Sequence, residues 1–382
     1  MKLRNCKLGD VLKLQRGHDL PERLRKEGEV PVVTSSGITG FHNEAKAKAP
    51  GVVTGRYGTL GEVFYLDQDY WPHNTSLYVV DFKGTNPRFA AYYLRHVLRN
   101  YQSDKAAVPG IDRNVLHALD VRVPFGPVQE PIANVLSAYD DAIENNRRRM
   151  GLLEKAARLL YEEWFVRLRF PGHEHTPITN GLPQGWARKE LGDVAASFED
   201  GDWIESKDQG GEDYRLLQIS NIGINEFVET GNFRFVSEDT FRRLNCRELS
   251  PGDLLISRMP TPIGRAWLVT SMPWKMITAV DAAILRVNDE VADTYFVLYH
   301  LNSKGSIGYC EQHAGGATRP RITRKELARQ PLVLPNLRVQ AHFRDVVKPI
   351  NDLRTKLYQA NNALRAARDL LLPRLMSGEI EV

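Results

Sequence analysis

The 382-residue sequence lacks the features of several protein classes. No apolar run approaches the roughly 18 residues that a transmembrane helix needs, and residues 1–10 have no apolar signal-peptide core. Three widely separated cysteines (Cys6, Cys246 and Cys310) form no CxxC pair, which argues against a disulfide framework. These absences predict a protein of the reducing cytoplasm with no membrane span.

Catalytic and cofactor motifs are also lacking. The sequence has no GxxxxGK[ST] loop for ATP. Residues 86–89 (NPRF) resemble the Asn-Pro-Pro-Tyr loop of adenine methyltransferases, but Arg88 replaces the second proline and no glycine-rich cofactor loop accompanies it. We read Asn86 as a helix cap with Pro87 in the first turn. His173 and His175 with Glu174 have no further spaced ligands, so we expect neither a catalytic nor a metal site.

Acidic residues give no better evidence of catalysis. Three carboxylates follow no recognisable nuclease spacing and are expected in a solvated loop: Glu199, Asp200 and Asp202. The net charge of +4 permits nucleic-acid binding without requiring it. With 42% hydrophobic and 26% charged residues, the chain has the composition of a globular protein large enough for two or three domains.

An internal repeat is present. The tetrapeptide Leu-Gly-Asp-Val at residues 8–11 recurs at residues 191–194, and further matches share an offset of 211 positions. These pairs are Arg113 with Arg324, Leu116 with Leu327, Val123-Pro124 with Leu334-Pro335, Gln129 with Gln340, Asp141 with Asp352 and Leu159-Leu160 with Leu370-Leu371. Several matches in one register predict a duplicated unit with pseudo-twofold symmetry, whose second copy carries extra loop residues.

Two long helices are predicted by apolar residues at a 3.5-residue period, from Ile132 to Trp164 and from Phe343 to Leu375. Each pattern covers about 38 residues, or about 57 Å of helix. The simplest partner for each stripe is the other, in an antiparallel coiled coil. The alternative is packing on the helix's own globular unit or on another chain. Asn146 falls either on the seam, where it would specify register, or in solvent beside Arg147–Arg149.

The segments before the helices have the pattern of α+β domains. Short apolar strands are separated by turns, with one amphipathic helix in each copy, at residues 87–101 and 293–303. The predicted strands are residues 30–36, 51–58, 61–66, 76–82, 119–124, 214–220, 253–258, 265–270, 282–287 and 331–335. The predicted organisation is a first domain (1–126), a helix (127–170), a linker (171–187), a second domain (188–336) and a second helix (337–382).

This plan, with five sequence segments inside it, resembles the specificity subunit of Type I restriction–modification systems. Residues 164–175 and 370–380 end the two helices, and residues 181–194 begin the second domain. Residues 50–63 and 251–269 have a strand–turn pattern, one in each domain. The resemblance implies two target recognition domains, each reading one half of a bipartite double-stranded DNA sequence, and a coiled-coil spacer that sets the gap between the halves.

The resemblance also implies partners. The chain would have no catalytic centre or cofactor of its own. It would direct two modification subunits, which are adenine-N6 methyltransferases using S-adenosylmethionine. With restriction (translocase–nuclease) subunits, which use ATP and Mg, the complex would cut unmodified DNA. The alternatives are a stand-alone DNA-modifying enzyme and an interaction scaffold that binds no DNA.

Candidate DNA-binding residues lie in the predicted loops, where amides, hydroxyls and guanidinium groups can reach base edges. In the first domain they are Thr34, Ser35, Ser36, Arg56, Tyr57 and Asn74; in the second they are Gln218, Asn221, Arg258, Thr261 and Arg265. Phosphate contacts are predicted for Lys105, Arg113, Arg319, Arg321, Arg324 and Lys325. For each of them, ordinary solvated surface is the alternative.

Overall fold

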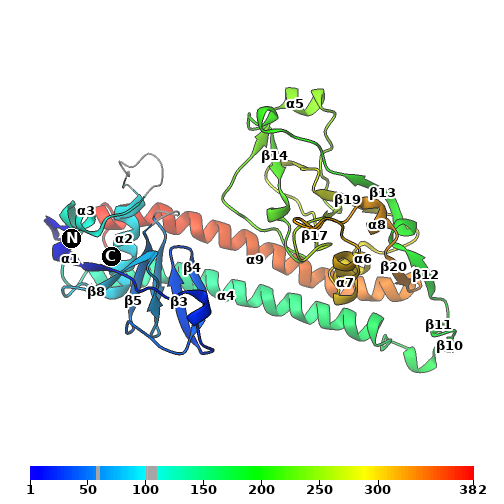
Figure 1. Cartoon of the computed structure of the whole chain (residues 1–382), viewed down its shortest axis with the longest axis horizontal. Coiled ribbons are helices and arrows are strands. Elements are labelled where there is room, and N and C mark those ends of the chain that lie inside the picture. Colours follow the sequence, from blue (N-terminus) through cyan, green and yellow to red (C-terminus); the bar gives the residue numbers. More distant parts are fainter. Residues whose placement is uncertain (57–60, 100, 102–109) are drawn as a thin grey trace. The chain divides into compact units, whose positions relative to one another are not determined.

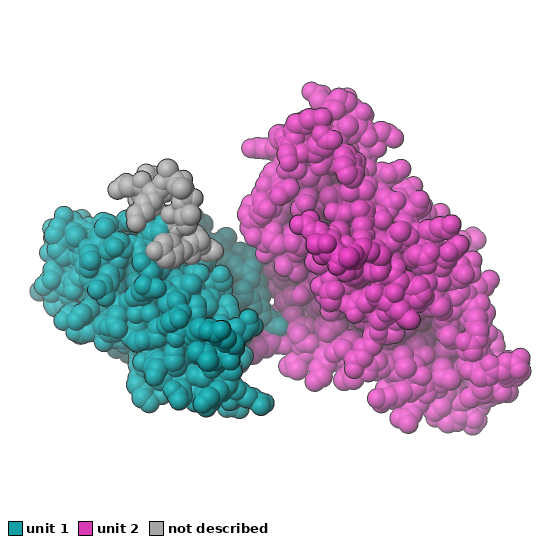
Figure 2. All heavy atoms as spheres, in the orientation of Figure 1, with its two compact units in different colours: residues 1–147, 359–382 teal, residues 148–358 magenta. Residues whose placement is uncertain are grey.

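The computed structural model describes residues 1–56, 61–99, 101 and 110–382 (Figure 1). It divides into two compact units (Figure 2). Unit 1 contains residues 1–147 and 359–382, and unit 2 contains residues 148–358. Both units combine sheets with helices, which confirms the predicted α+β class. Among the described residues, no helix is long and apolar enough to cross a membrane.

Unit 1 builds its domain from three sheets, with strand orders β2-β8-β5-β6, β4-β3-β7 and β1-β9. The strands β2 and β8 are antiparallel, while β3 is antiparallel to β4 and parallel to β7. The elements are β1 (Leu3–Lys7), α1 (Leu8–Val11), β2 (Lys13–Arg16), η1 (Glu22–Leu24), β3 (Val30–Thr34), β4 (Gly37–His42), β5 (Gly51–Gly55), β6 (Val63–Leu66), β7 (Trp71–Pro72), β8 (Ser76–Asp81), α2 (Pro87–Arg99), α3 (Arg113–Ala118) and β9 (Asp120–Pro124).

Unit 2 repeats this topology, with strand orders β13-β19-β16-β17, β15-β14-β18 and β12-β20. Its elements are η3 (His173–His175), β10 (Ile178–Thr179), β11 (Leu182–Pro183), β12 (Ala187–Glu190), η4 (Leu191–Val194), β13 (Ala195–Asp200), η5 (Ser206–Asp208), β14 (Tyr214–Leu217), η6 (Ile219–Asn221), β15 (Phe235–Val236), α5 (Glu238–Arg243), β16 (Leu254–Ser257), β17 (Ala266–Leu268), β18 (Lys275–Thr278), β19 (Ala282–Val287), α6 (Thr294–Leu301), α7 (Lys304–Gln312), α8 (Arg324–Ala328) and β20 (Pro331–Leu334). The matching strand orders confirm the predicted duplication.

Equivalent glutamines make the same two hydrogen bonds within each copy of the repeat. The side chain of Gln129 accepts a hydrogen bond from the backbone N–H of Asn86 at 3.0 Å and donates to the carbonyl of Pro124 at 2.9 Å. Gln340 accepts from the N–H of Asp293 at 2.8 Å and donates, at 2.7 Å, to the proline carbonyl that follows β20. Asn86 and Asp293 cap α2 and α6, so the predicted capping role of Asn86 is confirmed.

Both predicted long helices are present. Helix α4 (Gln129–Tyr161) continues into a π-helical turn, η2 (Glu162–Val166), and α9 covers Leu337–Ser377. Helix α9 contains Pro349 and Pro373 and remains continuous through both. Each helix contributes one part to each unit, so each unit contains a segment of both helices.

The two helices pair antiparallel within unit 1. Asn146 of α4 donates a hydrogen bond to the side-chain oxygen of Asn361 of α9 at 2.9 Å. Earlier on α4, Asp140 forms an ion pair with Arg368, which lies later on α9. The opposite order of the partners along the two helices confirms the antiparallel pairing and places Asn146 on the seam.

The same antiparallel order occurs within unit 2. Phe343, which is fully buried near the start of α9, packs against three aromatic residues at the end of α4 and in η2. Its ring centroid lies 6.1 Å from that of Tyr161, 5.8 Å from that of Trp164 and 5.0 Å from that of Phe165. These contacts fix the end of one helix against the start of the other.

The seam asparagines provide a test of this pairing. In Asn146→Leu, the buried amide of Asn361 loses its side-chain partner, so we expect the free energy of unfolding to fall by about 1–3 kcal/mol. The double variant with Asn361→Leu replaces both polar groups and should recover most of this loss. Urea unfolding measures both values. An additive loss in the double variant would contradict the contact.

The segment predicted as a linker is structured. Residues 173–175 form η3, and the short strands β10 and β11 pair as a hairpin. At its two ends, the buried rings of Phe170 and Trp186 lie 5.0 Å apart in the core of unit 2. This segment is therefore anchored to unit 2 at both ends.

Candidate nucleic-acid interface

The structure brings most candidates of the first domain together. The turn between β3 and β4, which holds Ser35 and Ser36, lies beside the turn before β8. The N–H of Ser35 points to the hydroxyl of Thr75 at 3.4 Å, and the N–H of Arg56 donates to the carbonyl of Thr75 at 2.9 Å. Asn74 is the neighbouring residue, and its amide donates to Asp19 at 2.5 Å. These turns form one polar cluster.

The hairpin turn itself is locally stabilised. The hydroxyl of Thr34 donates to the carbonyl of Gly37 at 3.2 Å and accepts from the N–H of Ser36 at 3.2 Å. The exposed Arg16, at the end of β2, donates to the carbonyl of Asn74 at 3.3 Å. Arg16 was not among the predicted residues, although a basic residue at the end of a short strand was the available signal.

Each domain has a place where the backbones of two turns approach closely, and these places correspond in the two domains. A Cβ atom on Gly17 would lie 2.1 Å from the carbonyl oxygen of His73, and one on Gly201 would lie 2.3 Å from that of Ala279. These distances leave no space for a side chain, so both positions need glycine. The repeat therefore includes the surface where the candidate residues gather.

Arg56 and Arg258 are structurally equivalent. The N–H of Arg56 donates to Thr75 at 2.9 Å, and the N–H of Arg258 donates to Asp281 at 3.0 Å. The carbonyl of each arginine accepts from an isoleucine N–H, at 2.8 Å in the first domain and 3.1 Å in the second. The two domains thus place an arginine at the same point of the same sheet.

Arg258 nevertheless differs from the prediction of a base contact. Its side chain is buried, donates to the carbonyl of Ile322 at 3.0 Å and forms an ion pair with Asp200. Burial lowers the pKa of its guanidinium, although the carboxylate of Asp200 opposes that shift. In this conformation the side chain of Arg258 bonds to other residues of its own domain. We therefore revise its role from contacting a base to stabilising the fold of the domain.

Asn221 and Arg265 require the same revision. Asn221 is buried; its side-chain oxygen accepts from the N–H of Gln218 at 2.9 Å and its amide donates to Val228 at 2.9 Å. Arg265 is buried and donates to four backbone carbonyls. Intramolecular partners occupy these polar groups, because the loops fold around them.

The other second-domain candidates lie nearer the surface. Gln218 is partly buried and Thr261 is exposed. Arg321 is partly buried and pairs with Asp281 at 3.2 Å, while the exposed Arg324 pairs with Asp200 at 3.2 Å. Three exposed cations have no ion pair in the part of the chain that the structure describes: Arg113, Arg319 and Lys325. Tyr57 and Lys105 lie outside the described residues.

The predicted solvated acidic loop is wrong. Glu199 and Asp200 belong to β13, where Glu199 pairs with Arg247 at 2.6 Å. Asp202 is 9% exposed and accepts from the N–H of Arg247 at 2.9 Å, and burial raises the pKa of its carboxyl group. These carboxylates balance arginines of the domain. Among the described residues, no three His, Cys, Asp or Glu side chains gather as a metal site.

Exposed aromatic residues near these loops were missed. The side chain of Trp203, just after β13, is 68% exposed, and that of Phe233 is 57% exposed. The guanidinium of the buried Arg215 lies 4.7 Å from the Phe233 ring centroid. An isolated aromatic residue in a loop gives no sequence signal of exposure, since the same residue type usually marks a core.

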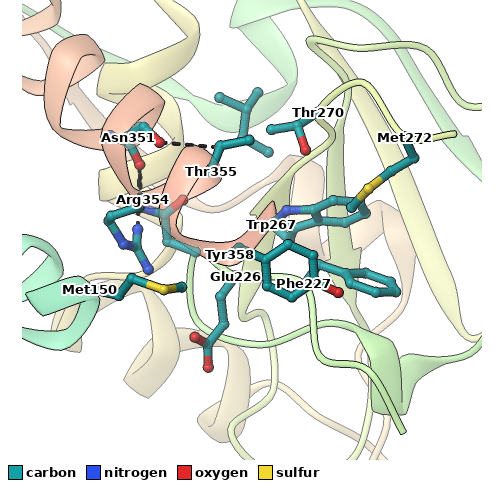
Figure 3. Close-up of a pocket in the computed structure, with 12 residues that line it drawn as sticks. Met150, Glu226, Phe227, Trp267, Thr270, Met272, Asn351, Arg354, Thr355 and Tyr358 are labelled. Carbon is teal, nitrogen blue, oxygen red and sulfur yellow. Dashed lines mark hydrogen bonds between the residues drawn. The ribbon is translucent and has the colours of Figure 1, made fainter. Parts of the chain in front are cut away.

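A small cavity lies where α9 packs on the second domain (Figure 3). Its volume is about 90 Å³, and Phe227 lies in its wall with its ring centroid 5.2 Å from that of Trp267 and 6.1 Å from that of Tyr358. Asn351 borders it and donates to the hydroxyl of Tyr299 at 3.0 Å. Small-molecule pockets usually exceed about 300 Å³, so this cavity is a packing gap at the helix attachment.

Comparison with known proteins identifies the family. The model described as "Type I restriction modification DNA specificity domain" matches residues 2–154 and 183–363. The chain belongs to this family. The two matches confirm the predicted resemblance and agree with two repeated target recognition domains. Family membership supports a role in DNA sequence specificity.

Named relatives agree with the family match. The MjaIX specificity subunit of Methanocaldococcus jannaschii is 22% identical, and the match covers 73% of this chain and 65% of the relative. The putative MjaX specificity subunit of that organism is 26% identical, with 76% and 68% covered. The crystal structure of a Type I S subunit from M. genitalium shares the fold, with a TM-score of 0.55, 18% identity and 98% and 96% covered.

Proposed function

We propose that the chain reads a bipartite double-stranded DNA sequence, with one half-site for each target recognition domain. The observation that carries this proposal is the repeated domain with an equivalent polar surface and different residues in each copy. Thr75 in the first copy corresponds to Asp281 in the second, beside the equivalent arginines. One scaffold with two sets of polar groups suits two unlike half-sites.

Within this proposal, the polar cluster of the first domain supplies base contacts from Ser35, Ser36 and Asn74, and the second domain supplies them from Gln218 and Thr261. The exposed, unpaired cations supply phosphate contacts, because they lose no intramolecular ion pair on binding. Tyr57 and Lys105 remain candidates on sequence grounds alone.

Partners complete the proposed complex. Two modification subunits, adenine-N6 methyltransferases carrying S-adenosylmethionine, would bind the scaffold formed by α4 and α9. Restriction subunits with ATP and Mg would add cleavage, in the cytoplasm. An exposed apolar stripe supports a helical partner: Leu152, Leu159 and Val166 follow one another at seven-residue spacing, with 67%, 47% and 63% exposure. The long helices would then set the gap between the half-sites.

Selection from a random DNA library tests the DNA-reading proposal. The chain, together with its modification subunit, should enrich a motif of two short sequences separated by a constant unspecified gap. Substituting Asn74→Ala should relax one half of the motif and leave the other unchanged. Enrichment of a single uninterrupted motif, or of none, would overturn the proposal.

Salt dependence tests the phosphate contacts. The double variant Arg319→Ala with Lys325→Ala should bind all DNA sequences more weakly and lower the slope of log affinity against log salt by about 2, because each phosphate contact contributes about 0.9. Fluorescence anisotropy of labelled DNA measures the slope when the affinity is determined at several salt concentrations from about 50 to about 200 mM. The exposed Arg23→Ala is the matched control. An unchanged slope would place both cations away from DNA.

A further inference from the structure

Both domains join two turns of the candidate surface through the same backbone contacts. His18 forms a parallel bridge with His73, and Asp202 forms a parallel bridge with Ala279. The N–H of His18 and the N–H of Asp202 each donate a hydrogen bond of 2.8 Å to the residue before the bridge partner. These contacts relate the residue that follows each bridged position in one domain to a single residue in the other.

The residues that follow the bridges are polar in the first domain and apolar in the second. Asp19 and Asn74 form a hydrogen-bonded pair at 2.5 Å. The equivalent positions of the second domain hold Trp203 and Val280. The two copies therefore carry an amide–carboxylate pair and two apolar side chains at the same point of the candidate surface.

The backbone on both sides of Trp203 is anchored, while its side chain is left uncovered. Asp202 accepts a hydrogen bond from the N–H of Arg247 at 2.9 Å, and Ile204 packs against the cluster that contains Tyr214. Trp203 is 68% exposed and belongs to no hydrophobic cluster of the described residues. An aromatic side chain held in this way loses little conformational entropy when it binds a ligand.

The polar edge of Trp203 is already engaged within its own loop. Lys207 forms an ion pair with Glu205 at 2.9 Å. Hydrogen bonds from the ammonium of Lys207 and, after it, from the indole of Trp203 lower the pKa of the Glu205 carboxyl group. The part of Trp203 that is left for a ligand is the apolar ring. In the major groove, the base-edge feature that suits an apolar side chain is the 5-methyl group of thymine.

Charges around this point do not oppose the approach of DNA. Every carboxylate of β13, of residues 201–209 and of the turn between β18 and β19 is paired with a cation. The pairs are Glu199 and Asp202 with Arg247, Asp200 with Arg258 and Arg324, Glu205 with Lys207, Asp208 with Arg243, and Asp281 with Arg321. The carbonyl of Val280 accepts a hydrogen bond from Arg321 at 3.0 Å. Phosphates therefore meet no unpaired carboxylate in these segments.

We infer that Trp203 is a specificity-determining residue of the second domain and that its ring contacts the 5-methyl group of a thymine in the second half-site. This inference rests on the proposed function, since it requires that the second domain reads DNA. At the equivalent point of the first half-site, Asn74 would read its base through hydrogen bonds. The two copies would then distinguish bases at one point of the shared scaffold by different chemistry.

Deoxyuridine substitution tests the inference, because uracil differs from thymine only by the missing methyl group. Each thymine in the second half-site of the selected motif is replaced in turn, on either strand, and the affinity of the chain with its modification subunit is measured. At one position the wild-type chain should bind the deoxyuridine DNA about 4-fold more weakly, the equivalent of about 0.8 kcal/mol for one apolar carbon group. In Trp203→Ala this difference should fall below about 2-fold, the usual scatter between independent sites.

Two further variants serve as controls. Trp203→Phe keeps an apolar ring, so it should retain the preference for thymine at that position. Ile178→Ala truncates an apolar side chain of similar exposure, 65%, in the β10–β11 hairpin, and it should leave the 4-fold difference unchanged. Since both side chains are exposed, the melting temperatures of the variants should stay within a few degrees of the wild-type value.

The outcomes separate this inference from the proposed function. If selection yields no second half-site, the proposed function and the inference fail together. If it yields two half-sites but the second contains no thymine whose replacement weakens binding, the inference fails alone. It also fails if Trp203→Ala keeps the full 4-fold difference. In that case, equal weakening on all DNA sequences would place the ring on the sugar–phosphate backbone, and weaker binding of the modification subunit would place it in a protein interface.

Discussion

Arg265→Ala should lower the free energy of unfolding by about 3 kcal/mol and weaken binding at one DNA half-site. The guanidinium of Arg265, which is 8% exposed, donates to the carbonyls of Ile219, Ile222, Pro260 and Pro262 at 2.6–2.9 Å. Its removal leaves four carbonyls without this donor in a largely buried site. Hydrogen bonds from charged groups contribute about 1.5–3 kcal/mol each and are not fully additive.

The effect on DNA would follow from the two loops that Arg265 joins, residues 219–222 and 260–262. They include the predicted base-contacting Thr261, while Gln218 precedes the first loop. Arg265→Lys keeps the charge but not the planar geometry, so it should recover only part of the stability. Urea unfolding and DNA titration of both variants measure the two effects. Unchanged stability in Arg265→Ala would contradict the supporting role.

Phe343→Ala should lower the free energy of unfolding of unit 2 by about 3–5 kcal/mol, the usual cost of removing a buried aromatic side chain. Phe343 is fully buried and lies between the two long helices, with ring contacts to Tyr161, Trp164, Phe165 and Tyr299. Alanine would leave a cavity beside these four aromatic rings, which would lose their contacts with the ring of Phe343.

The matched control for this prediction is Val346→Ala. Val346 lies on the same helix but is 46% exposed, so its truncation should cost less than about 1 kcal/mol. Hydrogen exchange should locate the loss of protection of Phe343→Ala at the end of α4 and the start of α9. Equal effects of the two variants would show that Phe343 does not join the helices.

The long helices could be predicted because their apolar period repeats over many turns. That period left Asn146 either on the seam or in solvent, and its hydrogen bond to Asn361 places it on the seam. The central strands of both domains were also predicted, since they are short runs of buried apolar residues. Strands β1 and β12 were missed. Their partners β9 and β20 lie more than 100 residues later, and their sequences contain many exposed polar residues, so no local pattern distinguishes them.

The candidate site could be predicted in part. The turns of the first domain that hold Ser35 and Asn74 were identified by residue type, and the fold brings them together. Arg258 and Arg265 show the limit of this reasoning, because an arginine at the end of a strand has the same sequence signature whether it faces DNA or backbone carbonyls. Which of these occurs depends on loops that arrive from distant parts of the chain.

The measurement that tests the central claim most directly is long-read methylome sequencing of cells that contain the modification subunit with this chain. We predict adenine methylation at one split motif. Exchanging residues 30–80 of the first domain for those of a relative should change one half of the motif. The gap and the other half should stay the same. If methylation at the split motif persists after the chain is deleted, or if both halves of the motif change after this exchange, the account is contradicted.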